Sequence, residues 1–182
     1  MKEIKREVLE VLLQSVGISN PIPELNYLYV DKENIVSTNL IALCIASHTM
    51  DVQKPFLIDR KIVAQALKIK KATYFRLFEN KVMSLDKDHV EIMTYSVSSH
   101  SDVTAEKYPE YKRVIPNSST KTISFVDSSQ ICGLVAHEGI LVESKHIPKI
   151  KKGTIDLQDS TSPIVINYKD FSLKLIVMPI IY

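Results

Sequence analysis

Hydrophobic residues at the start of the chain follow the spacing of an amphipathic helix. Between Glu3 and Val16, apolar positions recur at helical intervals and charged residues occupy the positions between them. Gly17 is a residue type that commonly ends a helix. β-Branched and aromatic residues then predict strands at 25–30, 35–38 and 40–47. The pattern predicts a helix followed by extended segments.

The same order of elements occurs twice more. Asp59 and Asp127 each follow a short apolar strand and precede an apolar stripe, which is typical of a helix N-cap. We predict helices from Asp59 to about Ile69 and from Asp127 to about Glu138. Further strands are predicted at 54–58, 73–78, 81–85, 90–97, 122–126, 153–157, 163–167 and 173–181. Three helix-plus-strands repeats predict an α+β fold, with helices on one face of antiparallel sheet.

A polar linker at 98–107 and a proline-containing segment at 108–116 separate the second repeat from the third. Because proline fixes its own backbone and restricts the residue before it, we expect 108–116 to be an extended connector. The sequence therefore predicts two domains, residues 1–107 with two repeats and residues 108–182 with the connector and one repeat.

Composition narrows the class of protein. The 182 residues are 45% hydrophobic and carry a formal net charge of +2, so only a local basic face would predict nucleic-acid binding. Cys44 and Cys132 lie in apolar runs, which favours buried thiols in a reducing cytoplasm over a disulfide framework. The charged N-terminus and the lack of an apolar run approaching roughly 20 residues predict neither export nor membrane insertion.

Motifs for catalysis or metal binding are missing from the sequence. Four scattered glycines do not form a phosphate-binding loop, and no nucleophilic serine motif or carboxylate pair stands out. The histidines have no metal-ligand spacing; they are His48, His89, His100, His137 and His146. We therefore predict a protein that is not an enzyme and needs no cofactor or metal.

Two segments resemble the bacterial DNA sliding clamp, the β subunit of DNA polymerase III. The connector Tyr108-Pro109-Glu110-Tyr111-Lys112-Arg113-Val114-Ile115-Pro116 is similar to the family's Phe-Pro-Asp-Tyr-Arg-Arg-Val-Leu-Pro-like segment, and the end Ile176-Val177-Met178-Pro179-Ile180-Ile181-Tyr182 to its Val-Val-Met-Pro-Met-Arg-Leu-like strand. Ser37-Thr38-Asn39-Leu40 resembles an Ala-Thr-Asp-Gly turn of the same family, with Asn and Leu in place of Asp and Gly. Leu25-Asn26-Tyr27-Leu28 and Phe56-Leu57-Ile58-Asp59-Arg60-Lys61 resemble segments of its middle domain.

This resemblance implies a shortened clamp of about one and a half clamp domains, from a bacterial, plasmid or phage gene. Such a protein would be a replication processivity factor in the cytoplasm of a bacterium or phage-infected host. It would encircle duplex DNA without reading sequence, and bind DNA polymerase and clamp-loader peptides. Clamp rings contain about twelve repeats, so three per chain imply a homotetramer.

The resemblance also implies two surfaces. A hydrophobic peptide-binding pocket would comprise Leu25, Thr38, Leu40, Leu43, Pro109, Arg113, Val114, Ile176, Met178, Pro179 and Ile180. A DNA-facing surface would comprise Lys2, Lys5, Arg6, Arg60, Lys61, Lys68, Lys70, Lys71, Lys149, Lys151 and Lys152. Without the resemblance, these residues have ordinary explanations, because Leu43, Val114 and Ile176 suit a core and helix-flanking lysines suit a solvated surface.

An alternative function keeps the pocket and drops the ring. The chain would then be a clamp-derived scaffold or inhibitor that binds replication proteins without surrounding DNA. A small enzyme is a further alternative, and it would require a titratable cleft that no sequence motif indicates.

Overall fold

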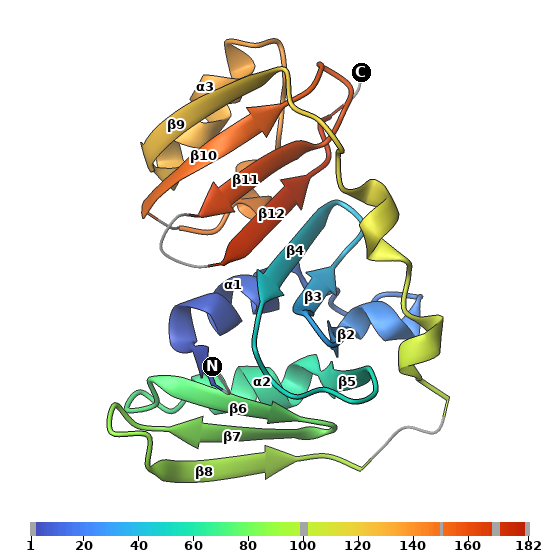
Figure 1. Ribbon diagram of the computed structural model, residues 1–182, viewed down its shortest axis with the longest axis vertical. Coiled ribbons are helices and arrows are strands. Elements are labelled where there is room, and N and C mark those ends of the chain that lie inside the picture. The colour runs from blue at the N-terminus through green and yellow to red at the C-terminus, as the bar shows by residue number, and fades with distance from the viewer. Residues whose placement is uncertain (1–2, 99–101, 150, 169–171, 181–182) are drawn as a thin grey trace. The chain divides into compact units, whose positions relative to one another are not determined.

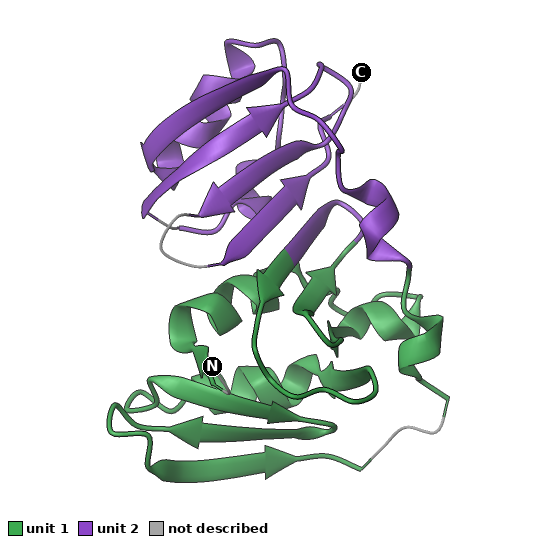
Figure 2. Cartoon of the chain, viewed as in Figure 1, with its two compact units in different colours: residues 1–39, 45–109 green, residues 40–44, 110–182 purple. Residues whose placement is uncertain are grey.

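The computed structural model describes residues 3–98, 102–149, 151–168 and 172–180, and it has two compact units (Figure 2). Unit 1 comprises residues 1–39 and 45–109, and unit 2 comprises residues 40–44 and 110–182. Helices and antiparallel strand pairs occur in both units, so the predicted α+β class is confirmed (Figure 1). The chain thus passes through unit 2 briefly at 40–44, which the predicted boundary after residue 107 did not include. The two domains given above remain a prediction.

Unit 1 begins with a short strand before its first helix. Ile4 and Lys5 form β1 (Ile4–Lys5), which pairs with β6 (Tyr74–Phe78), and α1 follows as Arg6–Ser15. The predicted helix start at Glu3 is therefore three residues early, because this backbone pairs with a strand distant in sequence. Leu9 and Leu12 of α1 have no exposed surface, as the helical pattern predicted.

The second helix of unit 1 is α2 (Arg60–Leu67), and its predicted cap is confirmed. The Asp59 carboxylate accepts a 2.6 Å hydrogen bond from the Lys61 backbone N–H. Ile62, Val63 and Ala66 form the buried face of the helix. The four-stranded sheet β1-β6-β7-β8 lies in the same unit, with β7 at Lys81–Leu85 and β8 at Glu91–Ser96.

Three further strands of unit 1 pair in the order β5-β2-β3. They are β5 (Phe56–Asp59), β2 (Tyr27–Val30) and β3 (Asn34–Thr38). Ser37 of β3 donates a buried 2.7 Å hydrogen bond to the carbonyl of Leu12, which ties α1 to this sheet. The segment predicted as a strand from Leu25 starts instead as the 3-10 turn η1 (Pro23–Asn26), because proline at its first position favours a turn.

Unit 2 contains four consecutive sheet neighbours, β9-β10-β11-β12. These are β9 (Lys121–Asp127), β10 (Lys151–Leu157), β11 (Ile164–Tyr168) and β12 (Leu173–Val177). Between β9 and β10 lie η4 (Ser128–Gln130), α3 (Ile131–Ala136) and η5 (Ser144–His146). Asp127 caps this region in a capping box with Gln130, which confirms the predicted cap and shows that the first turn is 3-10.

Close packing of β10 against its neighbours in unit 2 requires glycine at position 153. A Cβ atom there would lie 2.4 Å from the Asn167 carbonyl oxygen and 2.6 Å from the Phe125 ring. Phe125 in turn meets the Tyr168 ring edge-to-face, with centroids 6.1 Å apart. These contacts lie on one side of the sheet, where Ile131 and Val135 of α3 are fully buried.

The connector differs from the extended segment that its prolines predicted. Residues Ala105–Lys107 form the 3-10 turn η2 in unit 1, and Tyr111–Val114 form η3 in unit 2. Pro109 precedes η3, where its fixed backbone is compatible with a turn. The strand β4 (Ala42–Ser47) is divided, with Ala42–Cys44 in unit 2 and the rest in unit 1.

Both cysteines are free thiols. Cys44 is fully buried as predicted, and burial raises the pKa of its thiol. Cys132 is only half-buried, less than its apolar surroundings predicted, and burial still raises the pKa of its thiol. Among the described residues, no helix is both long and apolar enough to cross a membrane.

Candidate functional site

Four positions of the expected peptide pocket are exposed hydrophobic side chains in unit 2. Leu40 is 58% exposed and Val114 49%, while Met178 and Ile180 are 40% and 37% exposed. Pro179, between the last two, is buried, so the chain alternates outward and inward side chains here. Large apolar side chains of this exposure are unusual when they lie together, and they favour a binding surface.

Two backbone hydrogen bonds assemble this surface within unit 2. The Met178 N–H donates to the Ile41 carbonyl at 2.9 Å, and the Ile180 N–H donates to the Leu141 carbonyl at 2.8 Å. Segments around residues 41, 141 and 178–180 are therefore neighbours although they are distant in sequence. We call the exposed side chains on these segments the apolar surface of unit 2: Leu40, Ile41, Leu141, Met178 and Ile180. Val114 is exposed on η3 in the same unit.

Ile41 and Leu141 are members of this surface that the sequence did not indicate. They are 44% and 45% exposed, respectively. Ile41 resembled an ordinary strand residue next to Leu40, and its exposure depends on where β4 begins. Leu141 lies in the apolar run 140–142, which follows the predicted third helix, and that run was the available signal.

Leu40 adopts a left-handed backbone conformation with φ of 75°. This region is unfavourable for residues that carry a Cβ atom, and it costs roughly 1–2 kcal/mol relative to ordinary conformations. The family turn that the sequence resembles has glycine at this position. Leucine at this position therefore combines an unfavourable backbone conformation with an exposed apolar side chain.

The remaining expected pocket residues are placed differently. Leu43 and Ile176 are buried in unit 2, and Leu25 has no exposed surface in unit 1. Thr38 is 7% exposed and Pro109 is half-buried, both in unit 1. Arg113 is largely exposed on η3 and forms a 2.6 Å ion pair with Glu110. In unit 2, the exposed part of the expected set is thus Leu40, Arg113, Val114, Met178 and Ile180.

Basic side chains of the expected DNA-facing surface are concentrated on α2 and its C-terminal turn. Lys61 and Lys68 lie seven residues apart and share an exposed face with Gln65. Lys70 and Lys71 are also exposed just beyond the helix, whereas Arg60 is half-buried. This arrangement presents several cations to solvent from one element, as non-specific phosphate binding requires.

Helix α1 offers fewer cations than its sequence suggested. The Arg6 guanidinium donates to the Leu67, Ile69 and Ala72 carbonyls at 2.9, 2.5 and 2.8 Å, and it also pairs with Glu10. Its hydrogen-bonding capacity is therefore used at the C-terminus of α2. The other exposed positions of α1 include Glu7, Glu10 and Gln14. Lys5 is exposed on β1, and Lys2 lies outside the described residues.

Unit 2 contributes a second basic group after η5. Lys149, Lys151 and Lys152 are exposed, and the first two line a cavity of about 400 Å³ with Cys132. Hydrogen bonds from Ser129 lower the pKa of Asp127 in the same cavity, and the positive charges of Lys151 and Lys149 lower it further. An ionised carboxylate therefore offsets part of this positive charge.

The whole chain is similar to several solved bacterial clamps. It aligns with the DNA polymerase III β subunit of Thermotoga maritima with a TM-score of 0.61 and 18% identity, covering 99% of this chain and 65% of that one. The β subunit of Caulobacter crescentus gives a TM-score of 0.64 at 15% identity, with coverage of 99% and 66%. That of Borrelia burgdorferi gives 0.63 at 15% identity, with coverage of 98% and 63%.

The chain has the fold of a bacterial sliding clamp, in a shortened form. It spans about 65% of the Thermotoga maritima clamp's length, which agrees with the shortened clamp expected from the sequence. Neither a protein-family model nor a curated protein matches the chain. The clamp fold is therefore established by structure at low sequence identity.

In the described ranges, no group of three or more His, Cys, Asp or Glu side chains could hold a metal ion. In unit 1, an ionic cluster joins Glu3 to Arg76 and His89. It links the segment that leads into β1 to β6 and to the turn between β7 and β8. This cluster has the character of a structural contact between chain segments.

Proposed function

We propose that the protein is a non-catalytic DNA sliding clamp that tethers DNA polymerase and other replication proteins, including the clamp loader, through the apolar surface of unit 2. The observation that carries the proposal is the grouping of Leu40, Met178 and Ile180 as exposed hydrophobic residues on a clamp fold. A partner peptide with hydrophobic anchors would bury these side chains, and Arg113 beside Val114 offers a cation on η3 of the same unit.

Peptide binding can be tested by fluorescence anisotropy with a labelled polymerase tail peptide. We expect Met178→Ala to weaken binding about tenfold, since it removes a large apolar contact of about 1.4 kcal/mol. Ile18→Ala is the control, because Ile18 is a 72% exposed apolar residue of unit 1 that belongs to none of the proposed surfaces. Equal affinity of the Met178→Ala variant and the unmodified protein would refute the assignment.

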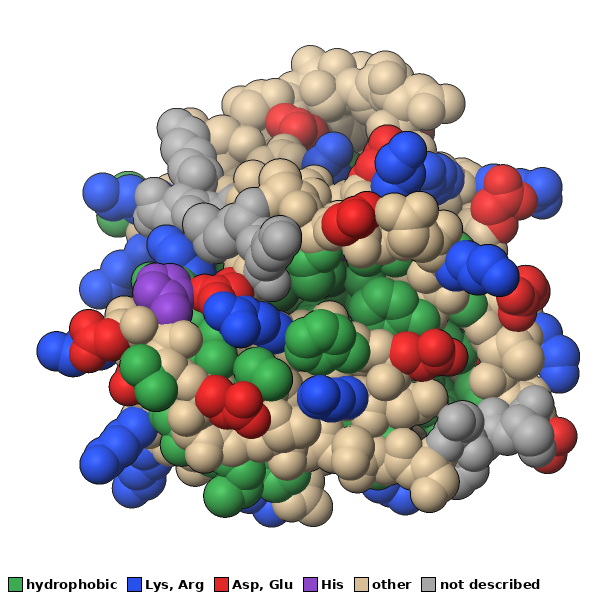
Figure 3. All heavy atoms as spheres, turned by 60° about the horizontal axis from the view of Figure 1, so that its bottom comes forward, with side chains coloured by type: hydrophobic (Ala, Val, Ile, Leu, Met, Phe, Trp, Pro, Cys, Tyr) green, Lys and Arg blue, Asp and Glu red, His purple; other side chains and the backbone are tan. Residues whose placement is uncertain are grey.

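We also propose that four copies form a ring around duplex DNA in the cytoplasm of a bacterium or phage-infected host. Sheet edges support this part of the proposal, since β8 and β9 each end a row of paired strands in the described ranges. Val90, Ile92 and Met93 are exposed at β8, and Val126 is exposed on β9. Figure 3 views the end of unit 1 that carries β8 and shows hydrophobic side chains bordered by charged ones. Unpaired edges with apolar residues are suited to strand pairing between copies.

DNA binding is tested at the basic face of α2. The triple change of Lys61, Lys68 and Lys71 to glutamate should abolish retention on nicked circular DNA at low salt. A matched control reverses three exposed lysines elsewhere: Lys32, Lys87 and Lys174. Retention of the first variant at the control's level would remove α2 from the DNA-facing surface.

One observation favours the alternative function of a scaffold that does not encircle DNA. The exposed face of α1 carries Glu7 and Glu10, and Arg6 is engaged in hydrogen bonds within unit 1. Acidic side chains on a helix that faced DNA would repel phosphates. A clamp would be retained on nicked circles and lost after linearisation, because it slides off ends, whereas a scaffold would show no such difference.

A further inference from the structure

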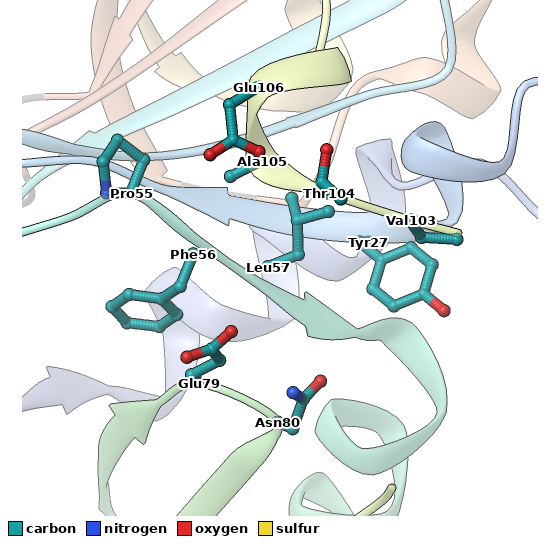
Figure 4. A pocket seen from close by; sticks show the side chains of 10 residues that line it. All are labelled: Tyr27, Pro55, Phe56, Leu57, Glu79, Asn80, Val103, Thr104, Ala105 and Glu106. Carbon is teal, nitrogen blue, oxygen red and sulfur yellow. The ribbon is translucent and has the colours of Figure 1, made fainter. Parts of the chain in front are cut away.

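A cavity in unit 1 lies apart from the surfaces assigned above. It has a volume of about 290 Å³ and is formed by β5, the turn between β6 and β7, and the segment 103–106 (Figure 4). Phe56 and Leu57 provide apolar wall, and Glu79, Asn80 and Glu106 provide polar groups. Its size is near the lower end of the range for small-ligand sites, and polar groups form most of its lining.

Two carboxylates lie at different sides of this cavity. In the view of Figure 4, Glu106 is above Leu57, and Glu79 is below it beside Phe56. Hydrogen bonds from its own backbone N–H and from Thr104 lower the pKa of Glu106, and the positive charge of Lys54 contributes less. Among the described residues, neither Glu79 nor Glu106 forms an ion pair, so both can accept a cation from a ligand.

The ring of Tyr27 forms part of the wall, and its hydroxyl points away from Phe56, Glu79 and Glu106 (Figure 4). Tyr27 is only 9% exposed, and its hydroxyl makes no hydrogen bond to another residue in the described part of the chain. Burial raises the pKa of Tyr27, and the charges of Asp59 and Glu24 raise it further, so the hydroxyl keeps its proton.

We propose that this cavity binds an arginine side chain presented by a peptide. The guanidinium is planar and carries five N–H donors, so it can lie against the Phe56 ring while it donates to Glu79 or Glu106. A peptide carbonyl supplies an acceptor for the Asn80 amide. Lysine matches the cavity less well, because a compact ammonium group does not stack on an aromatic face or donate in a planar fork.

The test uses the whole protein and two peptides that differ in charge but hardly in shape. Acetyl-Gly-Arg-Gly-amide and its citrulline counterpart are titrated in low salt, and NMR follows the backbone amides of residues 79–80 and 103–106. We expect saturable shifts of these amides with the arginine peptide and none with citrulline. Equal shifts with both peptides, or none with either, would overturn the proposal.

Variants locate the binding to the two carboxylates. Glu79→Gln and Glu106→Gln should each weaken the arginine peptide about tenfold, since each removes a charge-assisted hydrogen bond. Glu7→Gln is the matched control, because Glu7 is an exposed carboxylate of the same unit on α1. Dispersed amide spectra of all three variants establish that they are folded. Unchanged affinity in both cavity variants would overturn the assignment, whatever the outcome of the tests on ring formation and polymerase peptides.

Discussion

Leu40 holds a backbone conformation that is unfavourable for any residue with a side chain. Its φ of 75° would suit glycine. Because the leucine side chain is 58% exposed, its burial in the isolated chain offsets little of the free energy that this backbone conformation costs. We predict that Leu40→Gly increases the free energy of unfolding by about 0.5–1 kcal/mol and weakens a hydrophobic partner peptide about tenfold. Urea unfolding and fluorescence anisotropy measure the two effects.

A second variant separates strain from contact. Leu40→Ala removes most of the side chain and keeps the Cβ atom that makes the conformation costly, so it should weaken the peptide as Leu40→Gly does without the gain in stability. If glycine and alanine variants were equally stable, strain at this position would be refuted. If both bound the peptide normally, Leu40 would have no part in recognition.

The lowered pKa of Glu3 makes the stability of unit 1 depend on pH in the acidic range. Burial alone would raise the pKa of this carboxyl, but hydrogen bonds and charges from Arg76 and His89 outweigh it and lower the pKa below its usual value. The group therefore stabilises the folded protein above about pH 4.5, and this stabilisation is lost as pH falls through the lowered value. We predict that Glu3→Gln loses less stability than the unmodified protein between about pH 5 and pH 3.

Urea unfolding at the two pH values measures this difference. Glu10→Gln is a suitable control because Glu10 is more exposed and pairs with Arg6 on the surface of α1. The role of Glu3 would be contradicted if Glu3→Gln and Glu10→Gln lost equal stability on acidification.

At the level of elements, Arg6 joins the start of α1 to the end of α2. Its guanidinium donates to the carbonyl of Leu67, the last residue of α2, and to the carbonyls of Ile69 and Ala72 in the turns that follow the helix. We predict that Arg6→Ala lowers the free energy of unfolding by about 2–3 kcal/mol, since three carbonyls lose a charged donor. Lys61→Ala, an exposed substitution on α2, should change it by less than about 0.5 kcal/mol. Thermal or urea unfolding distinguishes them, and an Arg6→Ala variant as stable as Lys61→Ala would contradict the role.

The elements that the sequence predicted well are those determined by local pattern. Apolar periodicity placed α1 and α2, and the short side chains of Asp59 and Asp127 marked both helical caps. The strand at Ile4–Lys5 was missed because it exists through pairing with Phe75 and Tyr74, about seventy residues away. Arg6 was predicted to face DNA for the same reason. Its carbonyl partners at residues 67–72 are distant in sequence, and hydrophobic periodicity does not predict that they contact α1.

At the level of the molecule, the shortened clamp fold could be predicted from the connector and the C-terminal segment. The membership of the apolar surface could only partly be predicted. Leu40, Met178 and Ile180 follow from resemblance, whereas Ile41 and Leu141 join them through backbone hydrogen bonds from Met178 and Ile180. Exposure depends on such long-range pairing, so residue type alone could not separate exposed Met178 from buried Ile176.

The proposed ring makes a prediction about which strand edges meet. If β8 of one copy pairs with β9 of the next, the contact is heterologous, and repeated contacts of this kind close into a ring. Ile92→Lys on β8 and Val126→Lys on β9 place a charge at exposed apolar positions of these edges, so each should convert the tetramer to monomers in light scattering.

Mixing the two variants discriminates between kinds of contact. The Ile92→Lys variant keeps an intact β9 and the Val126→Lys variant keeps an intact β8, so one interface can form between them and the mixture should contain dimers of one copy each. A contact of β8 with β8 would leave Val126→Lys assembled alone, and a contact of β9 with β9 would leave Ile92→Lys assembled alone. A stable monomer of the unmodified protein at micromolar concentration would rule out the ring and leave the scaffold function.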